Sequence, residues 1–216
     1  MSRKPHGEST RPRHVTLAVV LQVRDASLQV LLWQRARAPY RGAWSLPGGA
    51  LEEGETLEDS IRRHLAAKVD VREVSHIEQL ATAYLGLVQL GLDPDVPDDT
   101  RWHPVDDLPE MAFDHGAIVL AGRERVRGKL SYSNAGFALA PPTFTLAELR
   151  EVYAAALGHE VSATNLKRVL ERRAVIEPTG DRRPSGRAGG RPAEVYRFRD
   201  TRLAITDPFA ALRPRR

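Results

Sequence analysis

The stretch that decides the fold runs over residues 44–71 and reads WSLPGGALEEGETLEDSIRRHLAAKVDV. Its Pro-Gly-Gly sequence predicts a turn. Thr56 then begins a helix, because its hydroxyl can cap the first turn and Asp59, three residues on, completes a capping-box pattern. Apolar residues follow at every fourth position of this helix and form one stripe, at Leu57, Ile61 and Leu65.

Strand patterns flank this helix on both sides. Residues 15–23 and 28–33 predict a hairpin-like pair of strands. After the helix come predicted strands over 74–80 and 83–90, an acidic loop, a short strand or turn over 102–105 and a helix over 114–130. The expected cap of that last helix is Asp114, and its apolar positions are Ile118, Leu120, Val126 and Leu130. Mixed strands and helices predict an α+β domain over residues 14–140.

Residues 77–90 run from one strand signal to the next with no turn residue between them. A single strand of this length would be long against a mode of ~5–6 residues. The segment is therefore either one unusually extended strand or two strands whose connecting loop, near Ala81–Ala83, is missing from the chain.

A second unit begins after residues 136–142, whose two prolines end any helix and predict an interdomain linker. Thr145 and Glu148 form another capping box, and Gly158 ends the helix. Ser162 caps a second helix over 162–173. A short strand at 175–177, a Gly/Arg-rich loop over 179–192 and a return strand at 194–198 complete a winged-helix plan over residues 143–216.

Composition narrows the function classes. The 216 residues contain no cysteine, which excludes disulfides, thiolate zinc sites and a cysteine nucleophile and fits a cytoplasmic protein. No apolar run approaches the ~18–20 residues of a membrane span, so no membrane partner is expected. Residues 1–13 are basic, without the apolar core of a signal peptide, and are expected to form a disordered arm.

The positive charge is concentrated in the last third of the chain. Residues 1–140 hold 17 Lys/Arg and 19 Asp/Glu, whereas residues 141–216 hold 15 and 9, a balance of +6. This asymmetry favours an anionic partner for the C-terminal unit, with nucleic acid first. A solvated basic surface is the alternative, and charge alone does not choose between them.

The spacing Gly49-x5-Glu55-x7-Arg63 resembles the front half of a Nudix box, the loop–helix–loop pattern G-x5-E-x7-R-E-U-x-E-E-x-G-U in which U is aliphatic. Leu65 and Val71 fit the aliphatic positions, and WSLPGG is similar to the usual approach to the box. The alternative is a chance match in an ordinary amphipathic helix. Agreement with the preceding strand pair favours the Nudix interpretation, and with it an α/β/α sandwich.

The chain departs from the Nudix pattern where the family binds metal. The three glutamates after the arginine are replaced by His64, Ala67 and Lys68, and the late glycine by Asp70. Positions 64, 67 and 68 share one helix face, and Mg²⁺ needs hard oxygen ligands there. We therefore expect no metal, no catalytic residue and little or no hydrolase activity. Rescue by a neighbouring glutamate (Glu52, Glu53, Glu55 or Glu58) would instead give an active hydrolase of ADP-ribose or another nucleoside diphosphate derivative.

The pocket of such a domain has several candidate ligand contacts. Arginines before the turn can grip phosphates, an aromatic ring can stack on a base, and a lysine on the former metal face can neutralise a phosphate. The candidates are Arg35, Arg37, Trp44, Gly48, Gly49, Glu55, Arg63, Lys68, Phe113 and His115. Core packing is the competing interpretation for Trp44 and Phe113, and a solvated surface for the arginines.

The second helix of the C-terminal unit is the candidate DNA reader. In a helix-turn-helix its N-terminal residues meet base edges, so Asn165 can pair with adenine and Arg168 with guanine or phosphate. Asn165 also has a capping or surface interpretation. The arginine-rich wing suits backbone or minor-groove contact. The candidate set is Ser162, Thr164, Asn165, Lys167, Arg168, Arg172, Arg187, Gly190 and Arg191.

A degenerate Nudix domain followed by a winged helix resembles the Nudix-related transcriptional regulators of the NrtR family. The stretches FTLAEL (144–149), NLKR (165–168), GGRP (189–192) and YRF (196–198) are similar to that family's DNA-binding half. The resemblance implies a homodimeric repressor of NAD-metabolism genes that binds a palindromic operator in double-stranded DNA. It also implies a nucleotide effector, ADP-ribose or a related NAD derivative, and no cofactor. A ligand-gated protein-interaction module is a further alternative, since winged helices also bind proteins.

Overall fold

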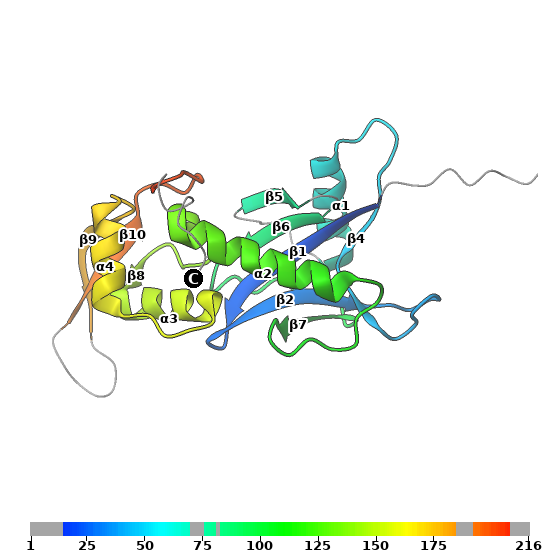
Figure 1. Cartoon of the computed structure of the whole chain (residues 1–216), viewed down its shortest axis with the longest axis horizontal. Coiled ribbons are helices and arrows are strands. Elements are labelled where there is room, and N and C mark those ends of the chain that lie inside the picture. Colours follow the sequence, from blue (N-terminus) through cyan, green and yellow to red (C-terminus); the bar gives the residue numbers. More distant parts are fainter. Residues whose placement is uncertain (1–14, 70–75, 81–82, 185–191, 208–216) are drawn as a thin grey trace, which may run out of the picture.

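The structure is a computed structural model that describes residues 15–69, 76–80, 83–184 and 192–207 (Figure 1). The predicted N-terminal arm and the suspected missing loop at 81–82 lie outside these residues. Among the described residues, no helix combines the length and the apolar character that a membrane span requires.

Seven strands form one mixed sheet built around the first of them. Their bounds are β1 (Val15–Arg24), β2 (Ser27–Gln34), β3 (Trp44–Ser45), β4 (Gly48–Ala50), β5 (His76–Leu80), β6 (Ala83–Val88) and β7 (Thr100–Pro104). β1 is antiparallel to β2 and β4 and parallel to β6, and the order along the sheet is β3-β2-β1-β6-β5. β5 and β6 are antiparallel, with Leu80 opposite Ala83, so residues 77–90 are not one extended strand.

Helices cover both faces of this sheet, because successive side chains of β1 point to opposite faces and pack into two different cores. Ala18 and Val20 face α1 (Leu57–Val69), where they pack with Ile61 and Leu65. Val19 and Leu21 face the other way, into the core that contains α2 (His115–Tyr132). Alternation of period two thus gives the α/β/α sandwich that the sequence predicts. The long α2 lies across the sheet in Figure 1.

Two details of α2 correct the sequence-based prediction. Asp114 occupies the N-cap position, but its side chain makes no capping hydrogen bond, because its backbone (φ −94°, ψ 15°) is not in the extended conformation that caps usually adopt. Leu120 is 40% exposed, whereas Val119 is fully buried. The buried stripe therefore follows Val119, Val126 and Leu130, at spacings of seven and four residues.

The C-terminal unit is a winged helix. Its elements are η1 (Ala135–Ala138), β8 (Phe144–Thr145), α3 (Leu146–Leu157), α4 (Ala163–Arg172), β9 (Ile176–Arg183) and β10 (Ala193–Phe198). Thr145 and Glu148 form the predicted capping box. Gly158 ends α3 at φ +74°, where a Cβ atom would also meet the Arg127 guanidinium at 2.3 Å. β8, β10 and β9 form the small sheet.

The first wing strand is longer than predicted. β9 extends to Arg183 rather than ending at residue 177, so residues 179–183 belong to a strand and not to the loop. Arg182 lies opposite Glu194, and Arg183 lies opposite Ala193. Pairing with β10 overrides the turn-forming Pro178 and Gly180 in this segment.

The predicted linker is a buried junction. Residues 135–140 are buried, and Gln89 donates from its side chain to the Phe137 carbonyl at 3.0 Å. The Leu90 amide donates to the Leu139 carbonyl at 2.8 Å. One apolar core runs from the sheet through this junction into α3 and α4. The small apolar residues before the prolines at 141–142 therefore pack as core.

Candidate functional site

The Nudix-like loop and helix are joined by an ion pair. Arg63 donates to both carboxylate oxygens of Glu55, from Nε at 2.8 Å and from Nη2 at 2.7 Å. These bonds hold the pKa of Glu55 at about 2, well below its ordinary 4.5. Glu55 also accepts from the Glu52 amide at 3.1 Å. The spaced Glu and Arg therefore fix the loop against α1, and Glu55 is a charged structural anchor.

His64 replaces the first metal-binding glutamate and turns inward. It is 8% exposed, and its Nε2 lies 3.1 Å from the Ala50 carbonyl, so this nitrogen carries the proton and donates. Its ring packs on Gly49, where a Cβ atom would lie only 2.4 Å from His64 Cε1. Glycine at 49 thus makes room for the imidazole.

The residues present do not fit the divalent cation of Nudix hydrolases. Ala67 offers no ligand atom, and the structure does not describe the Lys68 side chain. Of the glutamates considered for rescue, Glu55 and Glu52 pair with Arg63, and Glu58 pairs with Arg62. Glu53 stays exposed. The described part of the chain contains no group of three or more His, Asp or Glu side chains arranged to hold a metal ion.

A second group gathers basic and aromatic side chains at the other end of the β3–β4 segment. The Arg35 guanidinium carbon lies 5.0 Å from the centre of the Phe113 ring, and the Phe113 ring packs edge-on against Tyr40 at 4.7 Å. Both aromatic residues are about half exposed, and both hold a positive φ, +63° for Tyr40 and +54° for Phe113. Exposed aromatic rings on unfavourable backbone conformations are typical of binding sites.

His115, the first residue of α2, lies beneath this cluster. Its ring is 5.4 Å from Phe113, and its Nδ1 accepts from the Leu46 amide at 3.1 Å. Ser45 Oγ is 3.0 Å from the same nitrogen. Because Nδ1 accepts from the Leu46 amide, the ring proton lies on Nε2, and burial lowers the pKa of His115.

The remaining ligand candidates divide between these two groups. Arg35 and Arg37 line a cavity of about 400 Å³ with Trp33. Trp44 packs on His103 at 4.4 Å and is partly buried, as its core interpretation predicted. Gly48 and Gly49 belong to β4, which pairs with β1, and they lie with the first group, the one formed by Glu55 and Arg63. Tyr40 was not among the ligand contacts predicted from the sequence, although it lies in the basic loop directly after Ala38 and Pro39.

The outward face of α4 carries the candidate DNA contacts. Leu166 and Leu170 are buried, whereas Thr164, Asn165, Arg168 and Arg172 are exposed. Arg168 Nη2 donates to Asn165 Oδ1 at 2.8 Å. Lys167 instead turns toward the wing, where its ammonium lies 5.3 Å from the Tyr196 ring and 3.6 Å from Glu171.

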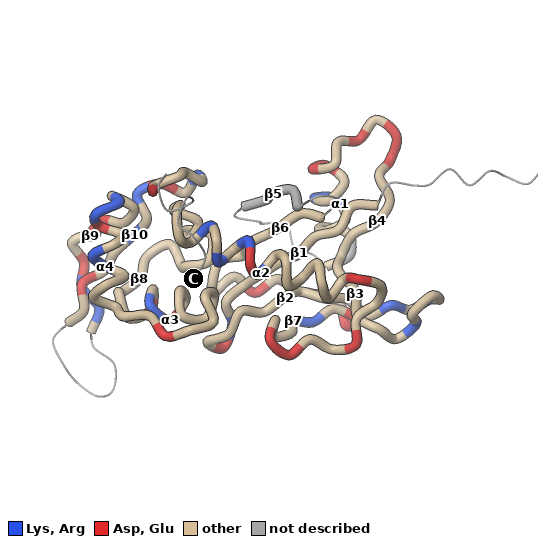
Figure 2. The backbone as a smooth tube through the Cα atoms, viewed as in Figure 1, with Lys and Arg blue, Asp and Glu red and all other residues tan. Residues whose placement is uncertain are grey.

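The wing is basic, but part of its charge is paired internally. Arg183 donates to the Glu148 carboxylate at 2.7 Å and to the Thr143 hydroxyl at 2.9 Å. Figure 2 shows basic residues along α4, β9 and β10, mixed with acidic ones. Arg187, Gly190 and Arg191 lie outside the described residues.

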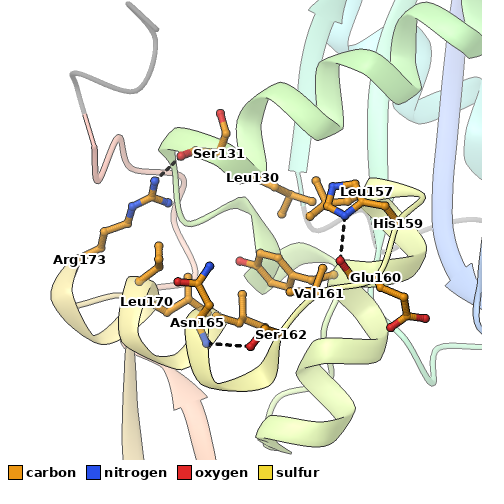
Figure 3. Close-up of a pocket in the computed structure, with 13 residues that line it drawn as sticks. Leu130, Ser131, Leu157, His159, Glu160, Val161, Ser162, Asn165, Leu170 and Arg173 are labelled. Atoms are coloured by element: carbon orange, nitrogen blue, oxygen red, sulfur yellow. Dashed lines mark hydrogen bonds between the residues drawn. The ribbon is translucent and has the colours of Figure 1, made fainter. Parts of the chain in front are cut away.

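A cavity of about 320 Å³ separates the start of α4 from the ends of α2 and α3 (Figure 3). Ser162 accepts from the Asn165 amide at 3.4 Å on one wall. On another wall Arg173 reaches across from the end of α4 to the Ser131 carbonyl near the end of α2. Arg173 is 9% exposed and also pairs with Asp207 at 3.2 Å, a connection that the sequence did not indicate.

Comparison with known proteins agrees with this two-part architecture. Residues 12–121 match the family described as the NUDIX domain, and residues 136–198 match the NrtR DNA-binding winged helix domain. The crystal structure of Shewanella oneidensis NrtR complexed with a 27mer DNA superposes with a TM-score of 0.71. The two chains are 31% identical, and the match covers 92% of this chain and 95% of the other.

This chain belongs to the NrtR family. Shewanella oneidensis NrtR in a second crystal structure gives a TM-score of 0.72 at 32% identity, over 91% of this chain and 95% of the other. The ADPR responsive transcriptional repressor NtrR of Acinetobacter baylyi is 28% identical over 201 residues, which cover 83% of this chain and 79% of the relative. The NrtR fold, with a Nudix domain joined to a winged helix, is thus confirmed.

Proposed function

We propose that this NrtR-family chain is a transcriptional repressor that binds operator DNA as a homodimer and releases it when ADP-ribose or a related NAD derivative binds. We infer that it acts in the cytoplasm on genes of NAD metabolism. The observation that carries the proposal is the match, along nearly the whole chain, to a relative crystallised on DNA. The relative from Acinetobacter, described as an ADPR responsive repressor, supports the nucleotide effector.

The DNA-binding surface is proposed to consist of α4 and the wing. α4 presents Asn165, Arg168 and Arg172 on its exposed side, and the unit as a whole carries the excess positive charge. Ser162, Thr164, Lys167, Arg187, Gly190 and Arg191 remain candidates from the sequence. Among them, Lys167 supports the helix–wing contact in the free chain, because its ammonium is held by Tyr196 and Glu171.

The effector site is proposed to lie at the Tyr40–Phe113 cluster. The exposed Phe113 ring offers a face for a purine base, and Arg35 and Arg37 provide charge for a diphosphate. The Glu55–Arg63 pair and His64 shape the neighbouring loop rather than supply a metal site. We therefore infer that the chain binds a nucleoside diphosphate derivative without hydrolysing it.

The two sites are connected by α2. Its first residue, His115, contacts Ser45 and Leu46 beneath the effector cluster. Near its far end, Ser131 meets Arg173, the residue directly after α4. Eighteen residues at 1.5 Å each make this helix about 27 Å long. Because the core continues from the sheet into the winged helix, we propose that α2 transmits an effector-induced shift as a rigid strut.

The test is a gel shift of the full chain on DNA from upstream of its own gene, with and without ADP-ribose. A retarded band that weakens steeply with salt and disappears with ADP-ribose supports the proposal. No retardation contradicts a repressor of its own locus. A band that ADP-ribose leaves unchanged removes this effector assignment but keeps the DNA-binding function.

A further inference from the structure

We infer that Arg168, held by Asn165, reads a guanine through its major-groove edge, and that α4 does not read adenine through Asn165. This inference rests on the proposed DNA-binding function and specifies which base the site accepts. It follows from the position of Arg168 on α4 and from the hydrogen bond between the two side chains.

Arg168 projects from the middle of the exposed face of α4. The buried residues Leu166 and Leu170 lie two positions before and after it. At 3.6 residues per turn, two positions place a side chain on nearly the opposite side of the helix. Arg168 therefore points directly away from the protein core, where a base edge lies when a recognition helix enters the major groove.

The bond to Asn165 leaves Arg168 with a complete donor fork. Nη2 carries two hydrogens, and one of them binds Asn165 Oδ1 at 2.8 Å. The second Nη2 hydrogen lies beside a hydrogen of either Nη1 or Nε. One pair of parallel N–H donors is therefore still available to a base. Guanine is the base that offers two adjacent acceptors, O6 and N7, in the major groove. Asn165 thus restricts the rotamers of Arg168 without using up its fork.

The same bond works against adenine recognition by Asn165. Adenine presents one acceptor, N7, beside one donor, the N6 amino group, so asparagine must accept with Oδ1 and donate with Nδ2. Oδ1 already accepts from a guanidinium, and the adenine amino group would have to approach that same positive group. The exposed pair therefore presents donors toward the groove.

The other basic residues of α4 are placed differently. Lys167 is held toward the wing by Tyr196 and Glu171. Arg172 is exposed in the last turn, one helical turn beyond Arg168, where phosphate is the expected contact. Loss of a guanine acceptor should therefore weaken DNA binding through the contact with Arg168.

The experiment starts by selecting a preferred site from a pool of randomised duplexes with the wild-type full chain. Each guanine of that site is then replaced singly by 7-deazaguanine, which keeps base pairing but lacks the N7 acceptor. Binding is measured for the wild type and for the Arg168→Ala, Asn165→Ala and Arg172→Ala variants. All three positions are exposed, and thermal denaturation checks that each variant is folded.

We expect one guanine per half-site at which the replacement weakens wild-type binding about tenfold, the lower part of the range for a bidentate contact. The effect should vanish in Arg168→Ala, which removes every donor, shrink in Asn165→Ala and persist in the Arg172→Ala control. The inference is overturned if no guanine replacement weakens the wild type more than Arg168→Ala. It is also overturned if replacing an adenine by 7-deazaadenine weakens the wild type but not Asn165→Ala. If the wild type binds no duplex in the selection, the proposed DNA-binding function fails, and this inference fails with it.

Discussion

Arg173, the residue that follows α4, donates a hydrogen bond to the backbone carbonyl of Ser131 near the end of α2. This contact joins the DNA-binding half of the chain to a helix of the Nudix half. Arg173 also pairs with Asp207, so the segment after the wing is tied to the same point. The end of α4 is therefore fixed to the end of α2 by side-chain contacts.

Replacing Arg173 by alanine should loosen this connection. We expect a loss of about 1–3 kcal/mol in the free energy of unfolding, because hydrogen-bonded partners of a largely buried guanidinium lose their donor. Urea denaturation measures this loss. The effect of ADP-ribose on DNA affinity should also decrease. Arg172→Ala, at an exposed neighbouring position, is the control, with a change within about 0.5 kcal/mol. If the two variants have the same free energy of unfolding and the same effect of ADP-ribose on DNA affinity, the result counts against α2 as the rigid connection between the two sites.

Glu55→Gln should change how stability depends on pH. The folded-state pKa of Glu55 is about 2, against an ordinary 4.5, so its stabilisation is complete above pH 4.5 and is lost as the pH falls toward 2. The glutamine variant should be less stable than the wild type at pH 7, and the difference should shrink on acidification. Denaturation midpoints over this window measure it, with Glu53→Gln, at an exposed position, as the control. A constant difference would refute the anchoring role.

Phe113→Ala should weaken the binding of ADP-ribose. Stacking of a base on an aromatic ring is worth about 1–3 kcal/mol, so a loss of roughly tenfold in affinity is expected by calorimetry. Leu120→Ala removes an exposed apolar side chain from the same region of the chain and should leave the affinity unchanged. Equal affinities for the two variants would place the effector elsewhere.

The wild-type chain should release no AMP from ADP-ribose in the presence of Mg²⁺ or Mn²⁺. The reason is the absence of carboxylates at positions 64, 67 and 68 and the ion pairing of Glu52, Glu55 and Glu58. The assay needs an active Nudix hydrolase as a positive control. Robust turnover that disappears in Glu55→Gln would show that the neighbouring glutamates rescue catalysis.

Local signals in the sequence predicted much of the fold. Period-two alternation in β1 and the capping residues Thr145 and Ser162 act over a few neighbouring residues, and each element lies where they indicated. The long strand β9 was not predicted, because pairing with β10 overrides its proline and glycine. Residues 136–140, part of the predicted linker at 136–142, are buried, and small residues before prolines give no sign of this burial.

The candidate site was predicted less completely than the fold. The Glu55–Arg63 pair follows a fixed spacing along the chain, so a motif could find it. The contacts of Arg173 with Ser131, of Arg183 with Glu148 and of Tyr40 with Phe113 join residues far apart in sequence. No local pattern encodes such contacts, because they depend on how the elements pack. For the same reason, nothing in the sequence indicates that Lys167 faces Tyr196.

The central claim is that one chain links DNA binding to nucleotide binding. Fluorescence anisotropy of a labelled duplex from upstream of the gene, titrated with the wild-type chain at fixed salt, tests it most directly. We predict that saturating ADP-ribose weakens DNA binding by about tenfold, within the usual range of coupling energies, and that DNA weakens ADP-ribose binding by the same factor. A DNA affinity that stays constant while calorimetry shows ADP-ribose bound would contradict the account.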